Sequence, residues 1–386
     1  MRMKTGIRQA YSAATDAQQA AREFYASVAQ PGMALVLFFC SSDYDLDALA
    51  DELNGLFAGI QLVGCTSAGE IGPGGYRDQG LAGVSFSAEA CTAVSGCIEN
   101  LRQFEISSGH ALAHRLLREL ERKAPQANEQ NSFAFLLTDG LSVREEAVAR
   151  TVQEALGKLP LTGGSAGDGL DFGKTYVYVD GAFRSDCAAL ALVTTPLPFM
   201  VFKTQHLVST DQRLVITEAD TTQRAVKEIN GLPAAEEYAR LLGIGAKELT
   251  PSRFAASPLV VMIDGNNYVR SIQKVNPDLS ITFYCAIEEG VVLRIAHGVN
   301  LIENLEEAFA QIRTQIGTPQ LVIACDCILR RMEIVQLHLE ERVGQIFKSN
   351  NAVGFNTYGE VFHGVHINQT LTGIAFGISS SEVQVG

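Results

Sequence analysis

The chain has 386 residues, of which 47% are hydrophobic and 19% are charged, and its 43 acidic and 30 basic residues give a formal charge of −13. This length suffices for two or three domains with full cores, and the composition is that of a compact soluble α/β protein. The acidic balance argues against binding to a nucleic-acid backbone, which depends on basic surface. No apolar stretch approaches the ~20 residues of a membrane helix. Residues 1–6 lack the apolar core of a secretory signal.

Eight cysteines are spread through the chain, and several lie inside predicted strands. This usage is typical of buried thiols in a reducing compartment, so we expect a cytoplasmic protein. Cys325 and Cys327 form the only close pair. Their one-residue spacer differs from that of a zinc knuckle and no histidine is nearby, so we expect a structural role at a strand end and no metal site.

The predicted elements begin with a helix over residues 16–28, which Pro31 and Gly32 end. Three apolar runs of strand length follow, and each precedes a helical segment. The strands are expected at 35–39, 133–137 and 321–324, and their helices at 45–57, 144–156 and 331–347. A further helix over 109–122 joins the first unit to the second. Because a second apolar run follows each helix, the order implies parallel strand pairs with right-handed crossovers.

The region between the second and third units has its own elements. Strands are expected at 188–194, 200–205 and 214–217, and helices at 226–233 and 234–242. Two hairpins are expected, one pairing 259–263 with 268–272 and the other pairing 281–286 with 291–296. We therefore predict an α/β fold with mixed, partly parallel sheets flanked by helices, built on a repeated strand-helix-strand-loop-strand unit. The expected divisions are an N-terminal helical segment (1–30) and two domains (31–221 and 222–386).

One short pattern occurs three times in the chain. Each copy places a hydroxyl residue, a spacer, a glycine and a carboxylate in the same order: Ser67 to Glu70, Ser165 to Asp168, and Thr357 to Glu360. The glycine indicates a backbone torsion or a close approach that a side chain would block. Ligands bind such sheets at the carboxyl ends of strands, so three converging loops would form a ligand pocket. Alternatively, each carboxylate only accepts hydrogen bonds from the amides of its own turn.

Four motifs in the chain together resemble the FIST family, in that family's order. They are Gly64 to Glu70, Gly163 to Asp168, Glu228 to Ala234 and Gly354 to Glu360. The resemblance covers nearly the whole chain and implies a FIST N domain over 31–221 and a FIST C domain over 222–386. It also implies a sensory role in signal transduction, with small ligands such as amino acids.

One branch of this family looks closer still, the stand-alone bacterial FIST proteins that sense nitric oxide through haem. The similarity rests on overall length, on the lack of an output segment and on the stretch from Thr204 to His206 that leads into Val215 to Asp220. It implies haem b as cofactor, nitric oxide as signal and a separate histidine kinase as partner. A homodimer is compatible with this resemblance.

Haem iron needs an axial donor, most often histidine. His206 is the first candidate because it ends a predicted strand at the domain junction, where ligand sites are favoured. His363 and His366 follow the third acidic loop and are the other candidates. Each of them could instead be an ordinary histidine at a strand end or in a surface hairpin. The chain has no Cys-x-x-Cys-His motif, so any haem would be bound without covalent attachment.

The acidic loops favour a different ligand, because carboxylates repel haem propionates and attract an ammonium group. An amine or amino-acid sensor without haem is therefore the rival hypothesis. It predicts one pocket lined by residues of all three loops: Ser67, Glu70, Ser165, Asp168, Asn356, Thr357, Tyr358 and Glu360. Residues 163–167 also match the Gly-x-Ser-x-Gly pattern of hydrolases. The adjacent Asp168 and the lack of an evident partner histidine argue against a catalytic triad, so we expect no enzymatic activity.

Overall fold

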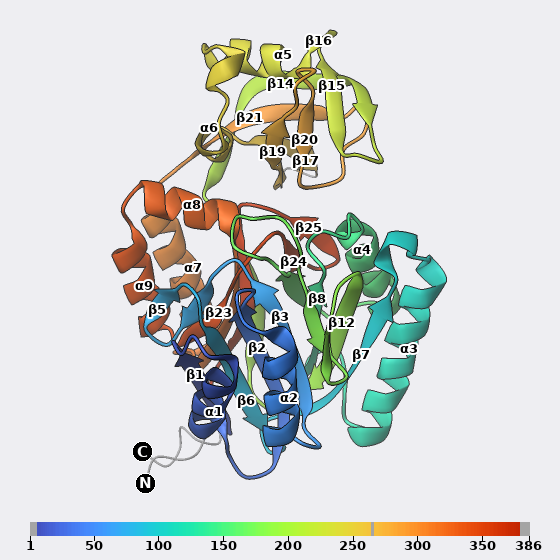
Figure 1. The fold of residues 1–386 in the computed structure, drawn as a ribbon, viewed down its shortest axis with the longest axis vertical. Coiled ribbons are helices and arrows are strands. Elements are labelled where there is room, and N and C mark those ends of the chain that lie inside the picture. The colour runs from blue at the N-terminus through green and yellow to red at the C-terminus, as the bar shows by residue number, and fades with distance from the viewer. Residues whose placement is uncertain (1–5, 264–265, 379–386) are drawn as a thin grey trace.

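Each of the three predicted strand–helix–strand units forms a parallel strand pair in the computed structural model, which describes residues 6–263 and 266–378 (Figure 1). The first unit comprises β2 (Met33–Ser41), α2 (Leu46–Leu56) and β3 (Gln61–Ser67); the second comprises β8 (Ser132–Thr138), α4 (Glu145–Leu156) and β9 (Leu161–Ser165). The third comprises β22 (Leu321–Cys327), α8 (Ile328–Gln336), α9 (Glu340–Ser349) and β23 (Ala352–Thr357). The repeated unit predicted from the sequence is therefore confirmed.

A short β-hairpin follows each unit in the chain and pairs with the sheet of another unit. The hairpins are β4 (Glu70–Gly72) with β5 (Gly75–Arg77), β10 (Val177–Val179) with β11 (Ala182–Arg184), and β24 (Glu360–Phe362) with β25 (Val365–Ile367). The first hairpin pairs with β23 of the third unit, the second with β3 of the first unit, and the third with β9 of the second unit. The three units thus exchange hairpins in a closed cycle.

Each chain segment then returns to its own sheet. The return strands β6 (Leu81–Ser87), β12 (Cys187–Thr194) and β26 (Leu371–Phe376) pair antiparallel with β2, β8 and β22. The strands β1 (Ile7–Ser12), β7 (Thr92–Glu99) and β13 (Phe199–Thr204) complete the three sheets at their edges. Three six-stranded sheets of matching topology result.

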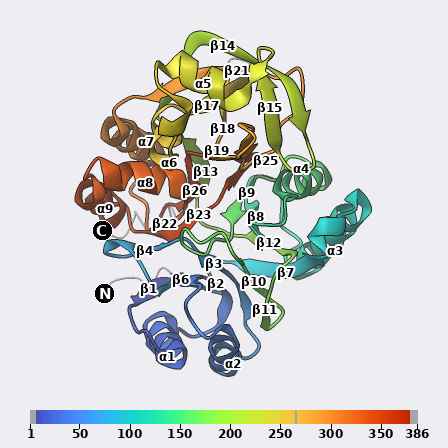
Figure 2. The same cartoon turned by 45° about the horizontal axis from the view of Figure 1, so that its top comes forward.

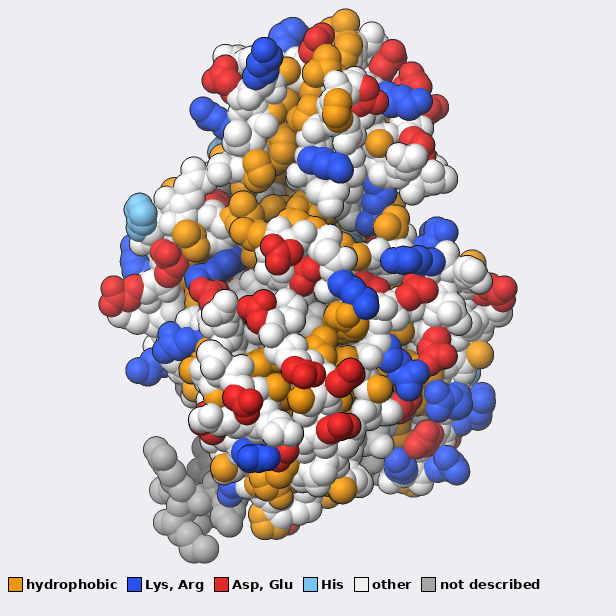
Figure 3. All heavy atoms as spheres, in the orientation of Figure 1, with side chains coloured by type: hydrophobic (Ala, Val, Ile, Leu, Met, Phe, Trp, Pro, Cys, Tyr) orange, Lys and Arg blue, Asp and Glu red, His pale blue; other side chains and the backbone are white. Residues whose placement is uncertain are grey.

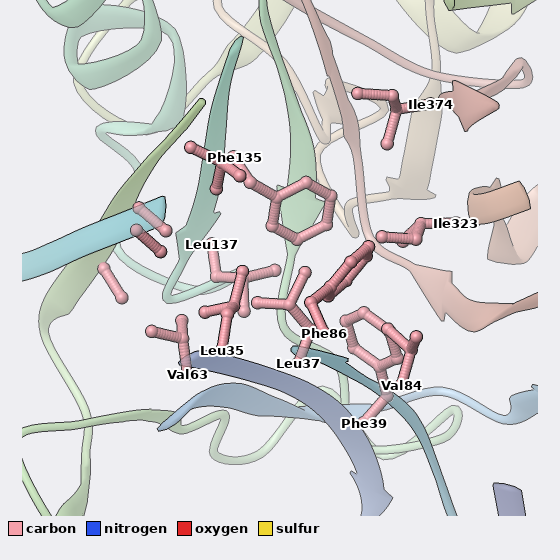
Figure 4. Close-up of a cluster of buried hydrophobic side chains, with 14 of the residues drawn as sticks. Leu35, Leu37, Phe39, Val63, Val84, Phe86, Phe135, Leu137, Ile323 and Ile374 are labelled. Atoms are coloured by element: carbon pink, nitrogen blue, oxygen red, sulfur yellow. The ribbon is translucent and has the colours of Figure 1, made fainter. Parts of the chain in front are cut away.

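The three sheets share one central core. Apolar side chains from all three converge there, as Figure 4 shows for Leu35, Phe39, Phe135, Ile323 and Ile374. The ring of Phe39 stacks on that of Phe355, with their centroids 4.3 Å apart. These strands read as continuous apolar runs because both of their faces are buried.

Helices cover the outer faces of the three sheets, as Figure 2 shows. The helix α1 (Ala17–Val28) packs beside α2, α3 (Ile106–Lys123) beside α4, and α7 (Leu301–Ile316) beside α9. Asp16 caps α1 by accepting a hydrogen bond from the Gln19 amide, and Asn300 caps α7 in the same way. None of the helices within the described part of the chain is both long and apolar enough to cross a membrane.

A smaller upper domain is inserted between β13 and α7 (Figure 1). It contains β14 (Leu207–Asp220), β15 (Ala225–Ile229), β16 (Leu232–Pro233), α5 (Ala234–Leu242), α6 (Pro251–Ala256), β17 (Leu259–Ile263), β18 (Asn266–Arg270), β19 (Ile272–Val275), β20 (Ile281–Phe283) and β21 (Val292–Gly298). The predicted helix over 234–242 and the β17–β18 pairing are confirmed.

Three local predictions were wrong. Residues 226–233 form the β15–β16 hairpin instead of a helix, because Asn230 and Gly231 both take positive φ and make a tight turn. The segments 281–286 and 291–296 do not pair, since β20 joins β15 and β19 while β21 joins β14 and β17. The helix expected over 331–347 is interrupted between α8 and α9, where His338 has φ +54°.

The close strand contacts give a first prediction. A Cβ atom on Gly354 would lie 1.9 Å from the carbonyl oxygen of Ala324 on β22. Gly354→Ala should therefore lower the free energy of unfolding by about 2 kcal/mol or more. Gly55→Ala is the control, because a Cβ there meets no atom within 4 Å and should raise stability by up to about 1 kcal/mol on α2. Equal effects in denaturant titrations would contradict this account of the strand packing.

Candidate functional site

The three six-stranded sheets and their helices, residues 7–204 and 301–376, form the body of the protein. The three glycine loops meet at the centre of this body. The amide of Ala68 donates to the carbonyl of Asn356 (2.9 Å), and the amide of Gly167 donates to the carbonyl of Thr66 (3.0 Å). The amide of Ser165 donates to the carbonyl of Gly359 (2.8 Å). Each loop is thus hydrogen-bonded to a loop of another unit at the carboxyl ends of β3, β9 and β23.

The glycine of each loop stands where another segment approaches closely, from a different unit at Gly69 and Gly167 and from the same unit at Gly359. Gly69 has φ +130°, and a Cβ there would lie 3.0 Å from Oδ1 of Asn356. A Cβ on Gly167 would lie 2.9 Å from the amide nitrogen of Ala68, and one on Gly359 would lie 2.1 Å from Nε2 of His366. The close approach that the sequence predicts at these glycines is therefore present in all three loops.

The first and third carboxylates hold equivalent positions and are fully buried. Glu70 accepts hydrogen bonds from the hydroxyl of Ser67 (2.6 Å) and the amide of Gly80 (3.0 Å). Glu360 accepts from the amide (3.1 Å) and the hydroxyl (2.6 Å) of Thr370. Each glutamate thus fastens its hairpin to the start of the return strand.

The second carboxylate organises its own loop. Asp168 accepts hydrogen bonds from the amides of Phe172 (3.0 Å), Gly173 (2.8 Å) and Lys174 (2.7 Å), and also from the hydroxyl of Tyr358. Both oxygens are therefore already engaged, and Tyr358 joins the second loop to the third.

Burial changes the charge of the two glutamates. Loss of solvent raises the pKa of Glu70 to about 8, although the hydrogen bonds from Ser67 and Gly80 oppose the rise. Burial also raises the pKa of Glu360 well above its ordinary value. Glu70 is therefore largely protonated near neutral pH, and burial favours the neutral form of Glu360 as well.

A cavity of about 710 Å³ opens beside these loops. It lies between the ends of β2 and β3, the loop after β9, α8, and Ser252 of α6 in the upper domain. Five acidic residues line it: Asp43, Glu70, Asp78, Asp168 and Asp171. Asp43, Asp78 and Asp171 are exposed, and Figure 3 shows acidic side chains gathered on this face below the upper domain.

Arg331 is the one basic residue among the described residues that line this cavity. Its guanidinium carbon lies 4.0 Å from the centroid of the Tyr76 ring, which holds the group by a cation–π contact. Its nearest carboxylate is that of Asp78, at 3.9 Å. Within the described chain, its buried Nη1 atom has no hydrogen-bond partner. A single oriented guanidinium therefore stands among acidic side chains.

The structure places only part of the predicted site in the cavity. Ser67, Glu70 and Asp168 line it. The remaining predicted residues lie in the contacts behind the loops: Ser165, Asn356, Thr357, Tyr358 and Glu360. Sequence reasoning missed Asp43, Asp78, Asp171 and Arg331, because no local pattern shows that these separate segments meet.

The three candidate haem ligands lie apart. His206 has a fully buried side chain, and its Nε2 atom lies 3.0 Å from both carboxylate oxygens of Glu333. His363 is exposed on the β24–β25 turn with φ +48°. His366 is buried, and burial lowers its pKa to about 4. In the described part of the chain, no group of three or more His, Cys, Asp or Glu side chains is arranged to hold a metal ion.

These positions fit haem poorly. None of the three histidines lines the acidic cavity. The propionates of haem are anionic, and the exposed carboxylates of Asp43, Asp78 and Asp171 would repel them. We therefore do not place haem in this cavity.

Ser165, His366 and Glu146 align in the order of a hydrolase triad. The hydroxyl of Ser165 lies 3.2 Å from Nε2 of His366, and Nδ1 of His366 lies 3.8 Å from Oε1 of Glu146. This partner histidine was missed in the sequence because it lies 201 positions from Ser165. The amide of Ala166, which would stabilise an oxyanion, already donates to Thr138 (2.8 Å), and Ser165 is buried. This geometry suits a structural polar cluster.

The comparisons with known proteins agree with the order of the motifs. The family described as FIST N domain matches residues 34–232, and the family described as FIST C domain matches residues 234–363. An uncharacterized protein of Methanocaldococcus jannaschii is 22% identical over 91% of this chain and 75% of its own length. A cyanuric acid hydrolase structure aligns at 8% identity and a TM-score of 0.33, covering 76% of this chain and 99% of the other.

The raised pKa of Glu70 gives a second prediction. The unfolded chain loses this proton near pH 4.5 and the folded chain near pH 8, so stability falls as the pH rises between these values. Glu70→Gln keeps an oxygen for the Gly80 amide and cannot ionise. The variant should match the wild type near pH 5 and exceed it near pH 8.5, by on the order of 2 kcal/mol. Denaturant titration at both pH values measures this difference, and an equal loss of stability at both would contradict a buried neutral carboxyl.

Proposed function

The chain belongs to the FIST family, whose domains are sensory ligand-binding domains in signalling, and we propose that it captures a small ligand carrying an ammonium group, such as an amino acid. The observation that carries this proposal is the acidic cavity beside the three glycine loops, with five acidic side chains and one arginine. A cavity of about 710 Å³ is within the size range of small-molecule sites.

The charges of the cavity favour a cationic group in two steps. The exposed carboxylates of Asp43, Asp78 and Asp171 attract an amine and repel anions before contact. The buried Glu70 then supplies the partner, because a nearby ammonium group favours its ionised form and lowers its pKa. Binding near neutral pH would therefore release a proton from Glu70.

Arg331 extends the proposal from amines to amino acids. A guanidinium is the side chain best suited to bind a carboxylate through two parallel hydrogen bonds. The Tyr76 ring holds the guanidinium of Arg331, and its Nη1 atom lacks a partner within the described residues. A zwitterion would place its carboxylate on Arg331 and its ammonium group toward Glu70 and Asp78.

The resemblance to haem-based nitric oxide sensors has less support from the same geometry, since His206, His363 and His366 lie outside the acidic cavity. A visible absorption spectrum of the haem-supplemented protein separates the two hypotheses. A sharp Soret band that shifts with nitric oxide and disappears in His206→Ala would replace the amine proposal. A separate histidine kinase as recipient of the signal is proposed on the family resemblance alone.

We propose binding without catalysis, supported by the buried Ser165 and the engaged Ala166 amide. We also propose a cytoplasmic protein. The support is that all eight cysteines are free thiols, as a reducing compartment allows.

The pKa of Glu70 gives a prediction for binding. Titration calorimetry with a panel of amino acids should find at least one ligand whose affinity rises about tenfold per pH unit up to pH 8 and then levels off. The apparent enthalpy should change with the ionisation heat of the buffer, because a proton is released. Glu70→Gln should lose this pH dependence, while Glu154→Gln on the exposed face of α4 should keep it. Failure of every amine and amino acid to bind would refute the proposal.

Arg331 allows amino acids to be distinguished from simple amines. Arg331→Met removes the guanidinium but keeps a long side chain against Tyr76. The variant should bind the amino acid about tenfold or more weakly than the wild type and bind the corresponding decarboxylated amine equally well. Equal loss for both ligands would show that Arg331 only shapes the cavity, and no loss for either would remove the carboxylate from the proposed binding mode.

A further inference from the structure

A second cavity of about 390 Å³ lies where the upper domain meets the start of α4. Residues of the body line one side, among them Arg102, Arg144 and Glu146. Residues of the upper domain, Thr221, Thr222, Arg224 and Ala286, line the other side. In Figure 1, the β14–β15 turn lies above α4. Figure 3 shows basic side chains on that side of the junction between the upper domain and the body.

The charge of this cavity is opposite to that of the protein. Three arginines and one glutamate line it, whereas the chain as a whole carries a formal charge of −13. The oxygens of Glu146 are already engaged, since Oε1 accepts from the amide of Ala286 (2.7 Å) and Oε2 from Arg224 (2.5 Å). The cavity therefore presents a net positive charge to a ligand.

The three arginines differ in how many ion pairs and hydrogen bonds they make within the protein. Arg224 is buried and donates to Glu145 (2.8 Å), to Glu146 and to the carbonyl of Tyr284. Arg102 and Arg144 are exposed, and within the described chain neither has a carboxylate at ion-pair distance. The only side-chain hydrogen bond of Arg144 among the described residues is a long one, 3.5 Å, to the carbonyl of Arg102. Two guanidinium groups are thus free to bind a ligand.

The backbone beside these arginines also contributes positive electrostatic potential to the cavity. Residues 141–144, 146 and 147 line the cavity, and the last two belong to the first turn of α4. Hydrogen bonding along the helix begins at the amide of Val148, which donates to Arg144, so the preceding amides have no helical acceptor. The positive end of the helix dipole therefore faces the side of the cavity where Arg144 stands.

We propose that this cavity binds a small oxyanion, the phosphate or carboxylate group of a metabolite, and that the bound anion ties the upper domain to the body. The guanidinium groups of Arg102 and Arg144 provide the fork-shaped donors that such groups prefer. Thr221 and Thr222 place hydroxyl groups on the opposite wall. This site lies apart from the acidic cavity, and the inference holds whether or not that cavity binds an amine.

Binding of three probe anions at constant ionic strength tests the inference: inorganic phosphate, pyrophosphate and malonate. Calorimetry and thermal unfolding of the full chain should show saturable binding of at least one of them. The doubly substituted Arg102→Gln/Arg144→Gln variant should bind it about tenfold or more weakly. Arg118→Gln/Arg122→Gln is the matched control, because both residues are exposed on α3 away from the cavity, and it should bind like the wild type.

The probe anion that binds most tightly identifies the chemical class of the ligand. Preference for phosphate or pyrophosphate indicates a phosphorylated ligand, and preference for malonate indicates a dicarboxylate. The bound anion should also slow amide hydrogen exchange at residues 221–224 of the upper domain. No saturable binding of any probe, equal binding by the Arg102/Arg144 variant, or unchanged exchange at 221–224 would each overturn the proposal. All four substituted arginines are exposed, so unfolding of the variants is not expected.

Discussion

The exchange of hairpins among three repeated units is the constraint on which the rest of the structure depends. The strands β3, β9 and β23 each leave one edge unpaired by their own unit, and buried backbone groups must find partners. A hairpin of another unit supplies those partners in each case. The hairpins β4–β5 and β24–β25 start directly after the first and third glycine loops, and β10–β11 follows the second loop after a short segment, so the exchange brings the three loops to one centre. The glycines are needed there because a Cβ atom would come too close to Asn356, Ala68 or His366.

The repeat is not perfect, and its departures create the candidate sites. The first and second loops open onto the acidic cavity, whereas the third is sealed by His366 and Tyr358. The third unit also carries α8 with Arg331 and receives the inserted upper domain. Phe172, in the loop that Asp168 holds, contacts Tyr358 of the third loop and Tyr284 of the upper domain, with ring centroids 4.7 and 5.6 Å away. A ligand on this loop would therefore act on the upper domain directly, and Ser252 of that domain lines the same cavity.

The sequence predicted what depends on short-range pattern and missed what depends on packing. The three apolar runs, the glycine loops and most helices follow from local periodicity and turn chemistry, and the structure contains them. The Asn230-Gly231 pair is a signal for a hairpin turn, but the residues around it have a helical pattern, and the sequence therefore predicted a helix where the β15–β16 hairpin lies. Ser165 and His366 are 201 positions apart in the sequence, and Arg331 and Tyr76 are 255 positions apart. Local pattern cannot assign such pairs, so only part of the acidic cavity could be named in advance.

Segments of all three units line one cavity, namely the first glycine loop, the second glycine loop and the start of α8 in the third unit, and we propose that they bind a ligand together. Amide hydrogen exchange, measured with and without a saturating amino acid that calorimetry shows to bind, tests this claim most directly. Exchange should slow together in residues 67–70, in residues 168–174 and in residues 328–332, because these three segments line one cavity. Protection confined to one of these segments, or found only outside all three, would contradict it.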